Sequence, residues 1–147
     1  MLTPSYSYVL ATASASILLN YFHFFLTGGA RKAAKVDYPN AYATHEDASK
    51  DPAKFAFNCA QRAHQNFLEQ LPVFMGSMLI GGLKYPVAMS ALGAVWIVGR
   101  VLYGLGYKNS SHNSTGQGRY KGGVALLVQV PMTGLALWTG YQLAMGL

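Results

Sequence analysis

Residues 57–72 read FNCAQRAHQNFLEQLP, and this polar stretch opens what is otherwise an apolar helix of membrane-spanning length. An Arg or a Glu inside a bilayer costs roughly 2.5 kcal/mol or more, so such residues are functional candidates by default. The first question that the sequence poses is therefore what Arg62, Asn66 and Glu69 hold.

The composition indicates an integral membrane protein of one domain. Hydrophobic residues make up 52% of the 147 residues and charged residues 11%, against roughly 25% charged residues in a soluble domain. The formal net charge of +6 is scattered over loops and helices, which is not the signature of a nucleic-acid-binding protein. Cys59 stands alone, which excludes an intrachain disulfide, and we interpret it as a small buried apolar residue. No spacing typical of a metal site is present.

The apolar runs predict four helices joined by one long polar loop, one tight turn and one medium polar loop. We expect them at about residues 6–27, 55–83, 86–107 and 122–147. About 22 residues suffice to span roughly 30 Å of hydrocarbon. Gly28-Gly29 should end the first helix, and Pro131 should kink the last. A cleaved signal peptide is the competing interpretation of residues 6–27, but no Lys or Arg precedes them. The predicted fold is all-α, an antiparallel four-helix bundle in a membrane.

The distribution of cations predicts the orientation of this bundle. Two connections, residues 28–56 and 108–121, hold nearly all the loop cations: Arg31, Lys32, Lys35, Lys50, Lys54, Lys108, Arg119 and Lys121. Only Lys84 lies on the opposite side. By the positive-inside rule both connections face the cytosol and both termini face away from it. The sequons Asn109-Ser110-Ser111 and Asn113-Ser114-Thr115 should then stay unmodified.

Two of the predicted helices carry a polar stripe at the end near the cation-rich connections. Arg62, Asn66 and Glu69 follow one another at i, i+4 and i+7, on one helix face. The third helix repeats the pattern at i, i+3 and i+7 with Arg100, Tyr103 and Tyr107. These stripes predict a polar pocket open to the cytosol and walled by apolar helix and lipid.

A structural alternative is that Glu69 simply pairs with Arg62 or Arg100 and holds the helices together. The two arginines outnumber the one acid, and this excess favours a small anionic ligand that also carries a cationic group. His64 lies roughly 200° around the helix from Arg62. A lone histidine is more often a packing residue. If it is functional, it serves a different pocket, such as one shared with another subunit.

Three segments together resemble a known family. FNCAQRAHQN followed by LE, then ALGAVWIVGRVLYGLGY, and ARKAAKVDYP in the first connection are similar to the microsomal glutathione S-transferase type 3 branch of the membrane-associated proteins in eicosanoid and glutathione metabolism. The resemblance covers about residues 6–145 in matching order and spacing.

This resemblance implies a homotrimer in the endoplasmic reticulum membrane with glutathione, as co-substrate, bound between subunits near the cytosolic face. It implies conjugation of glutathione to lipophilic electrophiles, reduction of lipid hydroperoxides and leukotriene-C synthase activity. The family's glutathione ligands carry over onto Arg62, Asn66, Glu69, Tyr103 and Tyr107, with Arg31 and His64 matching positions from the neighbouring subunit. Arg100 is a further candidate for gripping a carboxylate of glutathione.

The group that activates the thiol is less directly indicated. In leukotriene-C synthase relatives it is an arginine after the third helix, but a count without gaps reaches Ser114 here. We nominate Arg119 as the catalytic group because it is the one arginine in this loop. Gln70 replaces a tyrosine of those relatives, so their substrate preference does not transfer.

Two other functions compete with a glutathione enzyme. A non-catalytic lipid-binding protein of the same fold would not need the retained glutathione ligands. A small transporter or proton relay would show broken helices or a pseudo-repeat, and neither is evident in the sequence.

Overall fold

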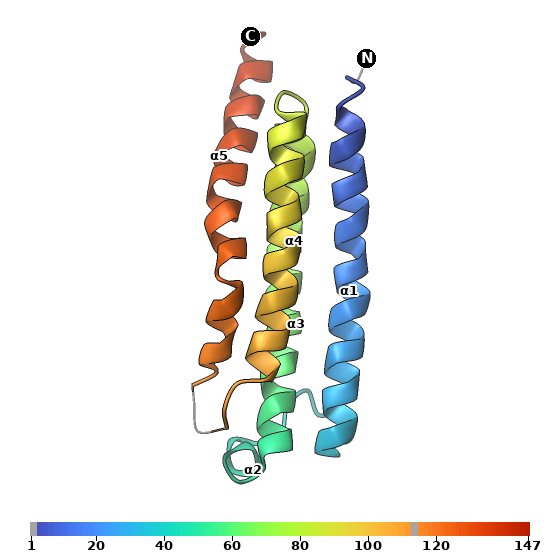
Figure 1. The fold of residues 1–147 in the computed structure, drawn as a ribbon, viewed down its shortest axis with the longest axis vertical. Coiled ribbons are helices and arrows are strands. Elements are labelled where there is room, and N and C mark those ends of the chain that lie inside the picture. The colour runs from blue at the N-terminus through green and yellow to red at the C-terminus, as the bar shows by residue number, and fades with distance from the viewer. Residues whose placement is uncertain (1–2, 113–114) are drawn as a thin grey trace.

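The computed structural model describes residues 3–112 and 115–147, and these residues form helices and connections with no strand (Figure 1). In chain order the elements are α1 Tyr6–Ala34, α2 His45–Lys50, α3 Pro52–Gly82, α4 Pro86–Lys108, the 3-10 helix η1 Gln117–Gly122 and α5 Val124–Ala144. The four long helices lie side by side along one axis, and α2 lies across one end (Figure 1).

Three of the long helices are long and apolar enough to cross a membrane. They are α1, α4 and α5. α3 falls outside this criterion because polar residues fill its first half. A fourth crossing by α3 therefore stays a prediction.

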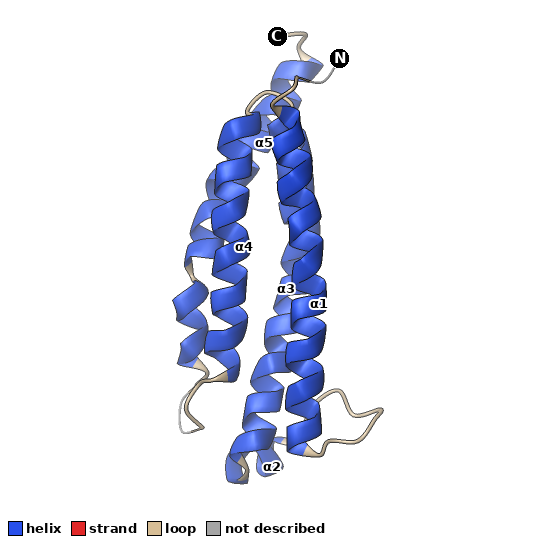
Figure 2. Cartoon of the chain, turned by 45° about the vertical axis from the view of Figure 1, so that its right-hand side comes forward, coloured by secondary structure: helices blue, strands red, loops and turns tan. Residues whose placement is uncertain are grey.

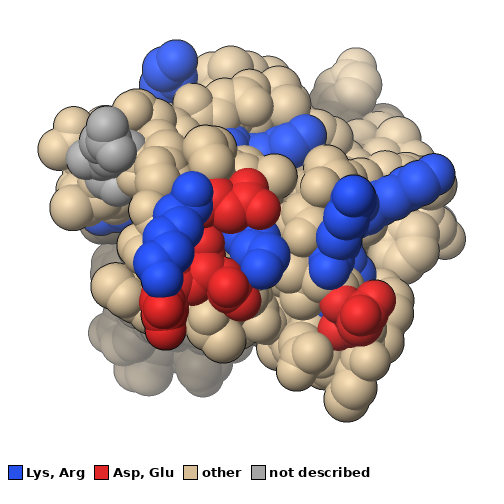
Figure 3. Space-filling model, turned by 90° about the horizontal axis from the view of Figure 1, so that it is seen from below, with Lys and Arg blue, Asp and Glu red and all other residues tan. Residues whose placement is uncertain are grey.

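The chain reverses direction between successive long helices. Both termini lie at one end, and α2 with the connections that follow α1 and α4 lies at the other (Figure 1). Seen from that second end, lysines and arginines lie beside two groups of acidic side chains (Figure 3). The two cation-rich connections thus share one end of the molecule, as their charge led us to expect.

The end of α1 differs from the prediction. The helix continues through Gly28-Gly29 to Ala34 because alanines with high helix propensity follow and no neighbouring atom obstructs either glycine. It ends at Lys35, which adopts φ 52° and donates its backbone N–H to Arg31 and Lys32. Both of these cations therefore lie on the last helical turn, where they interact favourably with the helix dipole.

Other helix ends differ by a few residues. α3 begins at Pro52 rather than at residue 55, because Asp51 caps it by accepting the Ala53 N–H at 2.8 Å. α5 covers Val124–Ala144, shorter than the predicted 122–147, and continues through Pro131. The residues before it form η1, where we had expected an irregular loop.

Aromatic and methionine side chains fill the centre of the fold. The rings of Phe74 on α3 and Trp96 on α4 stack with centroids 3.9 Å apart. Met78, Met89 and Met132 are fully buried around them. This core fixes α3 against α4 and α5, and so fixes the relative positions of the two polar stripes.

Glycines bring η1 into backbone contact with α4. A Cβ atom at Gly106 would overlap the carbonyl oxygen of Gly118, and one at Gly122 would overlap that of Gly99. The glycines of α4 therefore serve close packing. This contact places η1, and Arg119 on it, beside the last turns of α4.

Candidate functional site

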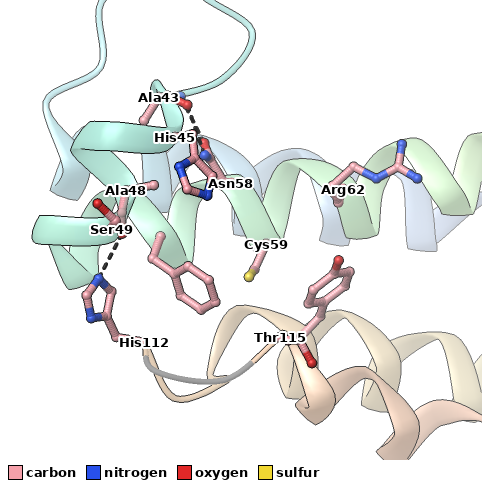
Figure 4. A pocket seen from close by; sticks show the side chains of 12 residues that line it. Ala43, His45, Ala48, Ser49, Asn58, Cys59, Arg62, His112 and Thr115 are labelled. Carbon is pink, nitrogen blue, oxygen red and sulfur yellow. Dashed lines mark hydrogen bonds between the residues drawn. The ribbon is translucent and has the colours of Figure 1, made fainter.

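A cavity of about 650 Å³ lies at the end of the molecule that holds α2 (Figure 4). In the lower half of Figure 2, α4 and α5 diverge from α1 and α3 toward this end. The walls come from α2, from the first turns of α3, from the end of α4 and from the connection after it. The lining residues are Ala43, His45, Ala48, Ser49, Phe55, Asn58, Cys59, Arg62, Tyr107, His112, Thr115 and Gly116.

Specific polar contacts assemble these walls. The side-chain amide of Asn58 on α3 makes two hydrogen bonds with the backbone of Ala43 (Figure 4). Asn58 Oδ1 accepts the Ala43 N–H at 2.8 Å, and Asn58 Nδ2 donates to the Ala43 carbonyl oxygen at 3.0 Å. His112 Nε2 lies 2.8 Å from the carbonyl oxygen of Ala48 on α2 (Figure 4). The connections after α1 and after α4 are therefore both tied to the α2–α3 segment, and these contacts hold the cavity walls together.

Arg62 and Tyr107 line this cavity from α3 and from α4. Arg62 is exposed and donates one hydrogen bond, from Nη1 to Gln65 Oε1 at 3.0 Å. Tyr42 donates to the same amide oxygen at 2.7 Å. Among the described residues no carboxylate pairs with Arg62. Its guanidinium thus retains N–H donors that an anion in the cavity can use.

Arg119 stands behind the part of the cavity wall that Thr115 and Gly116 form. Its Nη1 donates to the carbonyl oxygens of these two residues at 2.7 and 3.3 Å, and its Nη2 donates to the Tyr120 hydroxyl at 3.1 Å. Slight burial lowers the pKa of the Arg119 guanidinium, but the phenols of Tyr120 and Tyr107 raise it by more, so its pKa lies above the ordinary value. Arg119 therefore supplies a permanent positive charge at this wall.

The two predicted polar stripes meet at Asn66 and Arg100. Arg100 Nη1 donates to Asn66 Oδ1 at 3.0 Å. The Arg100 side chain is only 1% exposed and lies 4.8 Å from the centre of the Tyr103 ring. Arg100 is not among the residues that line the cavity. Tyr103 in turn packs edge-on against Tyr107 with ring centroids 5.7 Å apart, so the polar stripe of α4 leads from the interior to the cavity.

Glu69 does not pair with either arginine. In residues 3–112 and 115–147 the ion pairs are Lys50–Glu46 and Lys54–Asp47, both near α2. Glu69 is exposed on α3. The structural alternative, in which a buried Arg–Glu pair holds the helices together, is therefore not what this chain forms.

Seven of the nine predicted site residues do not line the cavity, and they are Arg31, His64, Asn66, Glu69, Arg100, Tyr103 and Arg119. His64 is half-buried and stacks on His23 of α1 with ring centroids 5.8 Å apart, which agrees with its placement on a different helix face from Arg62. Arg31 donates to the carbonyl oxygen of Asn40 at 2.7 Å and lies 4.6 Å from the centre of the Phe57 ring. Arg31 thus holds the connection after α1, and a role for either residue toward a neighbouring subunit stays a prediction.

The contribution of α2 to the cavity was not predicted from the sequence. His45, Ala48 and Ser49 come from this short helix, which we had read as loop. Thr44 accepts the Asp47 N–H at 3.1 Å, and a Thr followed three residues later by an acid is a helix-start signal. Ser114, the position that a count without gaps reaches, lies outside the described residues, as does Asn113 of the second sequon.

A second hollow lies between α3 and α5. It is a groove of about 560 Å³ whose lining is mostly apolar: Gln70, Leu126, Gln129, Val130, Thr133, Gly134 and Leu137. Gln70 comes from α3, one residue after Glu69, and all the others come from α5. Gln70 therefore lines a mostly apolar groove.

Comparison with known proteins gives two findings. Residues 9–138 match the sequence model of the MAPEG family. The uncharacterized protein sll1147 of Synechocystis sp. is 34% identical over 99 residues, which cover 67% of this chain and 64% of that protein. The aligned segment thus spans somewhat less than two thirds of this relative.

Proposed function

The chain belongs to the MAPEG family, and from this premise we propose that it is a membrane glutathione transferase and peroxidase. The observation that carries the proposal is that Arg62 and Tyr107 line the same cavity. The positively charged Arg119 lies behind one wall of this cavity, next to Tyr107. A cavity with cationic donors and no paired carboxylate suits an anionic ligand.

We propose an assembly in which four helices of each subunit cross the membrane and three subunits form a trimer. The gathering of cations at the α2 end supports an orientation with this end in the cytosol, as in the endoplasmic reticulum membrane. Glu69 is exposed, and Arg31 and His64 lie outside the cavity of their own chain. All three are therefore available to complete a glutathione site at a boundary between subunits.

Glutathione offers two carboxylates, one ammonium group and a thiol. Arg62 binds a carboxylate through its remaining N–H donors, and Glu69 accepts from the ammonium group. Asn66 presents its amide in a fixed orientation because Arg100 holds its oxygen. We assign Arg100 a positioning role toward Asn66, since the guanidinium is buried and does not reach the cavity. The hydroxyls of Tyr103 and Tyr107 supply further hydrogen bonds.

The chemistry begins with the thiol. A free thiol has a pKa of about 8.5, so it is mostly protonated at neutral pH. A guanidinium beside the sulfur favours the thiolate, and Arg119 is the group we assign to this task. In the transferase reaction the thiolate attacks an electrophilic carbon and either displaces a leaving group as its anion or opens an epoxide, whose oxygen then takes up a proton. In the peroxidase reaction it attacks the terminal hydroperoxide oxygen, which releases the lipid alcohol after protonation. A second glutathione then converts the resulting sulfenic acid to glutathione disulfide and water.

The lipophilic second substrate needs an apolar surface that is reached from the bilayer. The groove between α3 and α5 has this character, and we propose that it holds the hydrocarbon part of the substrate. Gln70 then places an amide at the groove, where leukotriene-C synthases have a tyrosine ring. This replacement should change substrate preference relative to relatives with a tyrosine there.

The proposal is tested by glutathione binding to the purified full chain in detergent, with thiolate formation followed by ultraviolet difference absorbance. We expect saturable binding at millimolar glutathione, weakened by Arg62→Ala and retained by Lys84→Ala at the opposite end of the molecule. If wild-type protein shows no saturable binding, the enzyme proposal is wrong. Binding of a fatty acid without glutathione binding would instead support the lipid-binding alternative.

A further inference from the structure

A second polar cluster lies inside the fold, away from the cavity. His23 on α1 is 0% exposed and Arg100 on α4 is 1% exposed. In the described part of the chain neither ring nitrogen of His23 has a hydrogen-bond partner, nor do Nε and Nη2 of Arg100. Buried polar atoms are nearly always hydrogen-bonded, so four such atoms on two neighbouring side chains require a partner.

His23 and Arg100 border the same small region. The His23 ring stacks on Phe67 with centroids 4.8 Å apart, and the Arg100 guanidinium carbon lies 6.0 Å from the centre of that same ring. Gly104 lies one turn beyond Arg100 on α4, and a Cβ atom there would stand 3.1 Å from His23 Cε1. The absence of a side chain at Gly104 is therefore what admits the imidazole so close to α4.

The cluster carries an uncompensated positive charge. Arginine stays protonated in proteins, and a buried charge is normally paired. The hydrogen bond to Asn66 supplies an amide oxygen but no negative charge. The ion pairs of the described residues lie near α2, and Glu69 is exposed. No carboxylate of the described residues compensates the charge of Arg100, so its counter-charge must come from another molecule.

We propose that a small inorganic anion of the chloride class is resident between Arg100 and His23. The donors that would hold it are the unpartnered Nε–H and Nη2–H of Arg100 and one ring N–H of His23. A monatomic anion fits this position better than a carboxylate of a peptide, because neither side chain lines the cavity through which a peptide would enter. This site is distinct from the proposed glutathione site, and it requires no glutathione.

The first test is thermal unfolding of the glutathione-free full chain in detergent. Chloride is titrated against gluconate at constant ionic strength, and the apparent Tm is measured. We expect a saturable rise of several degrees with chloride, since a ligand that binds only the folded state stabilises it. His23→Phe keeps an aromatic ring on Phe67 but removes both nitrogens, and this variant should lose the chloride dependence.

Ser16→Ala is the matched control, because it removes another fully buried polar group from the same helix α1. It should keep the wild-type chloride response. Equal Tm values of the wild-type protein in chloride and gluconate, or the same response in His23→Phe, would overturn the proposal.

The second test is direct and needs no variant. Crystals grown with bromide and without glutathione should give an anomalous peak within hydrogen-bond distance of Arg100 Nε and Nη2. Density at this position that is explained by water alone contradicts a resident anion. Density that appears only with glutathione would identify a carboxylate of glutathione as the partner of Arg100, and would also overturn the proposal.

Discussion

Arg119 of η1 and Tyr107 of α4 face one another, with the guanidinium carbon 5.5 Å from the centre of the phenol ring. This relationship depends on the path of the chain before η1. Gly116 adopts φ 71°, and a Cβ atom there would overlap the Tyr107 ring. Glycine thus lets the connection pass close to α4 and turn Arg119 back toward the cavity wall. The arginine nominated from the sequence is therefore held beside a tyrosine of the proposed glutathione site.

Arg119→Ala should separate thiol activation from glutathione binding. If Arg62 and Glu69 hold the peptide ends of glutathione, the dissociation constant should change little. The thiolate signal at pH 7 should fall toward the roughly 3% expected of a free thiol. Ultraviolet difference absorbance measures the thiolate, and equilibrium dialysis measures binding. Lys121→Ala, an exposed neighbour on the same 3-10 helix, is the control. Loss of binding with the thiolate fraction unchanged would assign the activation to another group.

Gly106→Ala should displace η1 from α4. The added methyl group would overlap the carbonyl oxygen of Gly118. This oxygen belongs to the backbone, so no change of side-chain rotamer can relieve the overlap. Such overpacking typically costs about 1–3 kcal/mol. We expect a lower Tm and a weaker thiolate signal, because Arg119 moves with η1. Gly140→Ala on α5 meets no atom within 4 Å and gains helix propensity, so it should leave the Tm unchanged or slightly raised. Equal effects of the two substitutions would mean that the close approach is not required.

Asn66→Leu should destabilise the protein even without glutathione. It removes the one hydrogen-bond partner of Arg100 among the described residues, and the guanidinium stays buried. Leaving a buried polar group unpaired costs about 1–3 kcal/mol, and more for a charged group. The measurement is the apparent Tm of the ligand-free protein. Gln65→Leu, which changes an exposed amide on the neighbouring position, should shift it less. A Tm unchanged by Asn66→Leu would mean that the hydrogen bond from Arg100 to Asn66 does not stabilise the folded chain.

Much of the architecture was readable from local pattern. The apolar runs placed α4 within a residue of its observed end, and the faces of α3 separated His64 from Arg62. The predicted end of α1 was wrong because a glycine pair can either end a helix or lie within it. The helix continues when residues of high helix propensity follow the glycines, as they do here. Helix propensity past Gly28-Gly29 was the signal that we underweighted.

The candidate site was predictable only in part, because its walls depend on contacts between distant segments. The placement of Arg62 and Tyr107 on one cavity follows from helix periodicity and antiparallel packing. The hydrogen bonds of Asn58 with Ala43 and of His112 with Ala48 each join a connection to a helix, across 15 and 64 positions of the chain, and no local pattern encodes them. The burial of Arg100 beside His23 likewise requires three helices to be placed at once.

The membrane orientation leads to a last prediction, on glycosylation. If the cation-rich connections face the cytosol, an acceptor sequon carried on a long N-terminal extension should be glycosylated in eukaryotic microsomes. The same tag inserted beside Tyr38, which is 79% exposed in the connection after α1, should stay unmodified, as should the natural Asn109. The extension keeps the acceptor asparagine far enough from the bilayer for the oligosaccharyltransferase to reach it. Asn109 lies directly at the end of α4, so its lack of modification alone would not establish the orientation. A mass shift removed by endoglycosidase reports modification. Modification of the tag beside Tyr38, with the N-terminal tag bare, would reverse the proposed topology and place the cavity on the lumenal side.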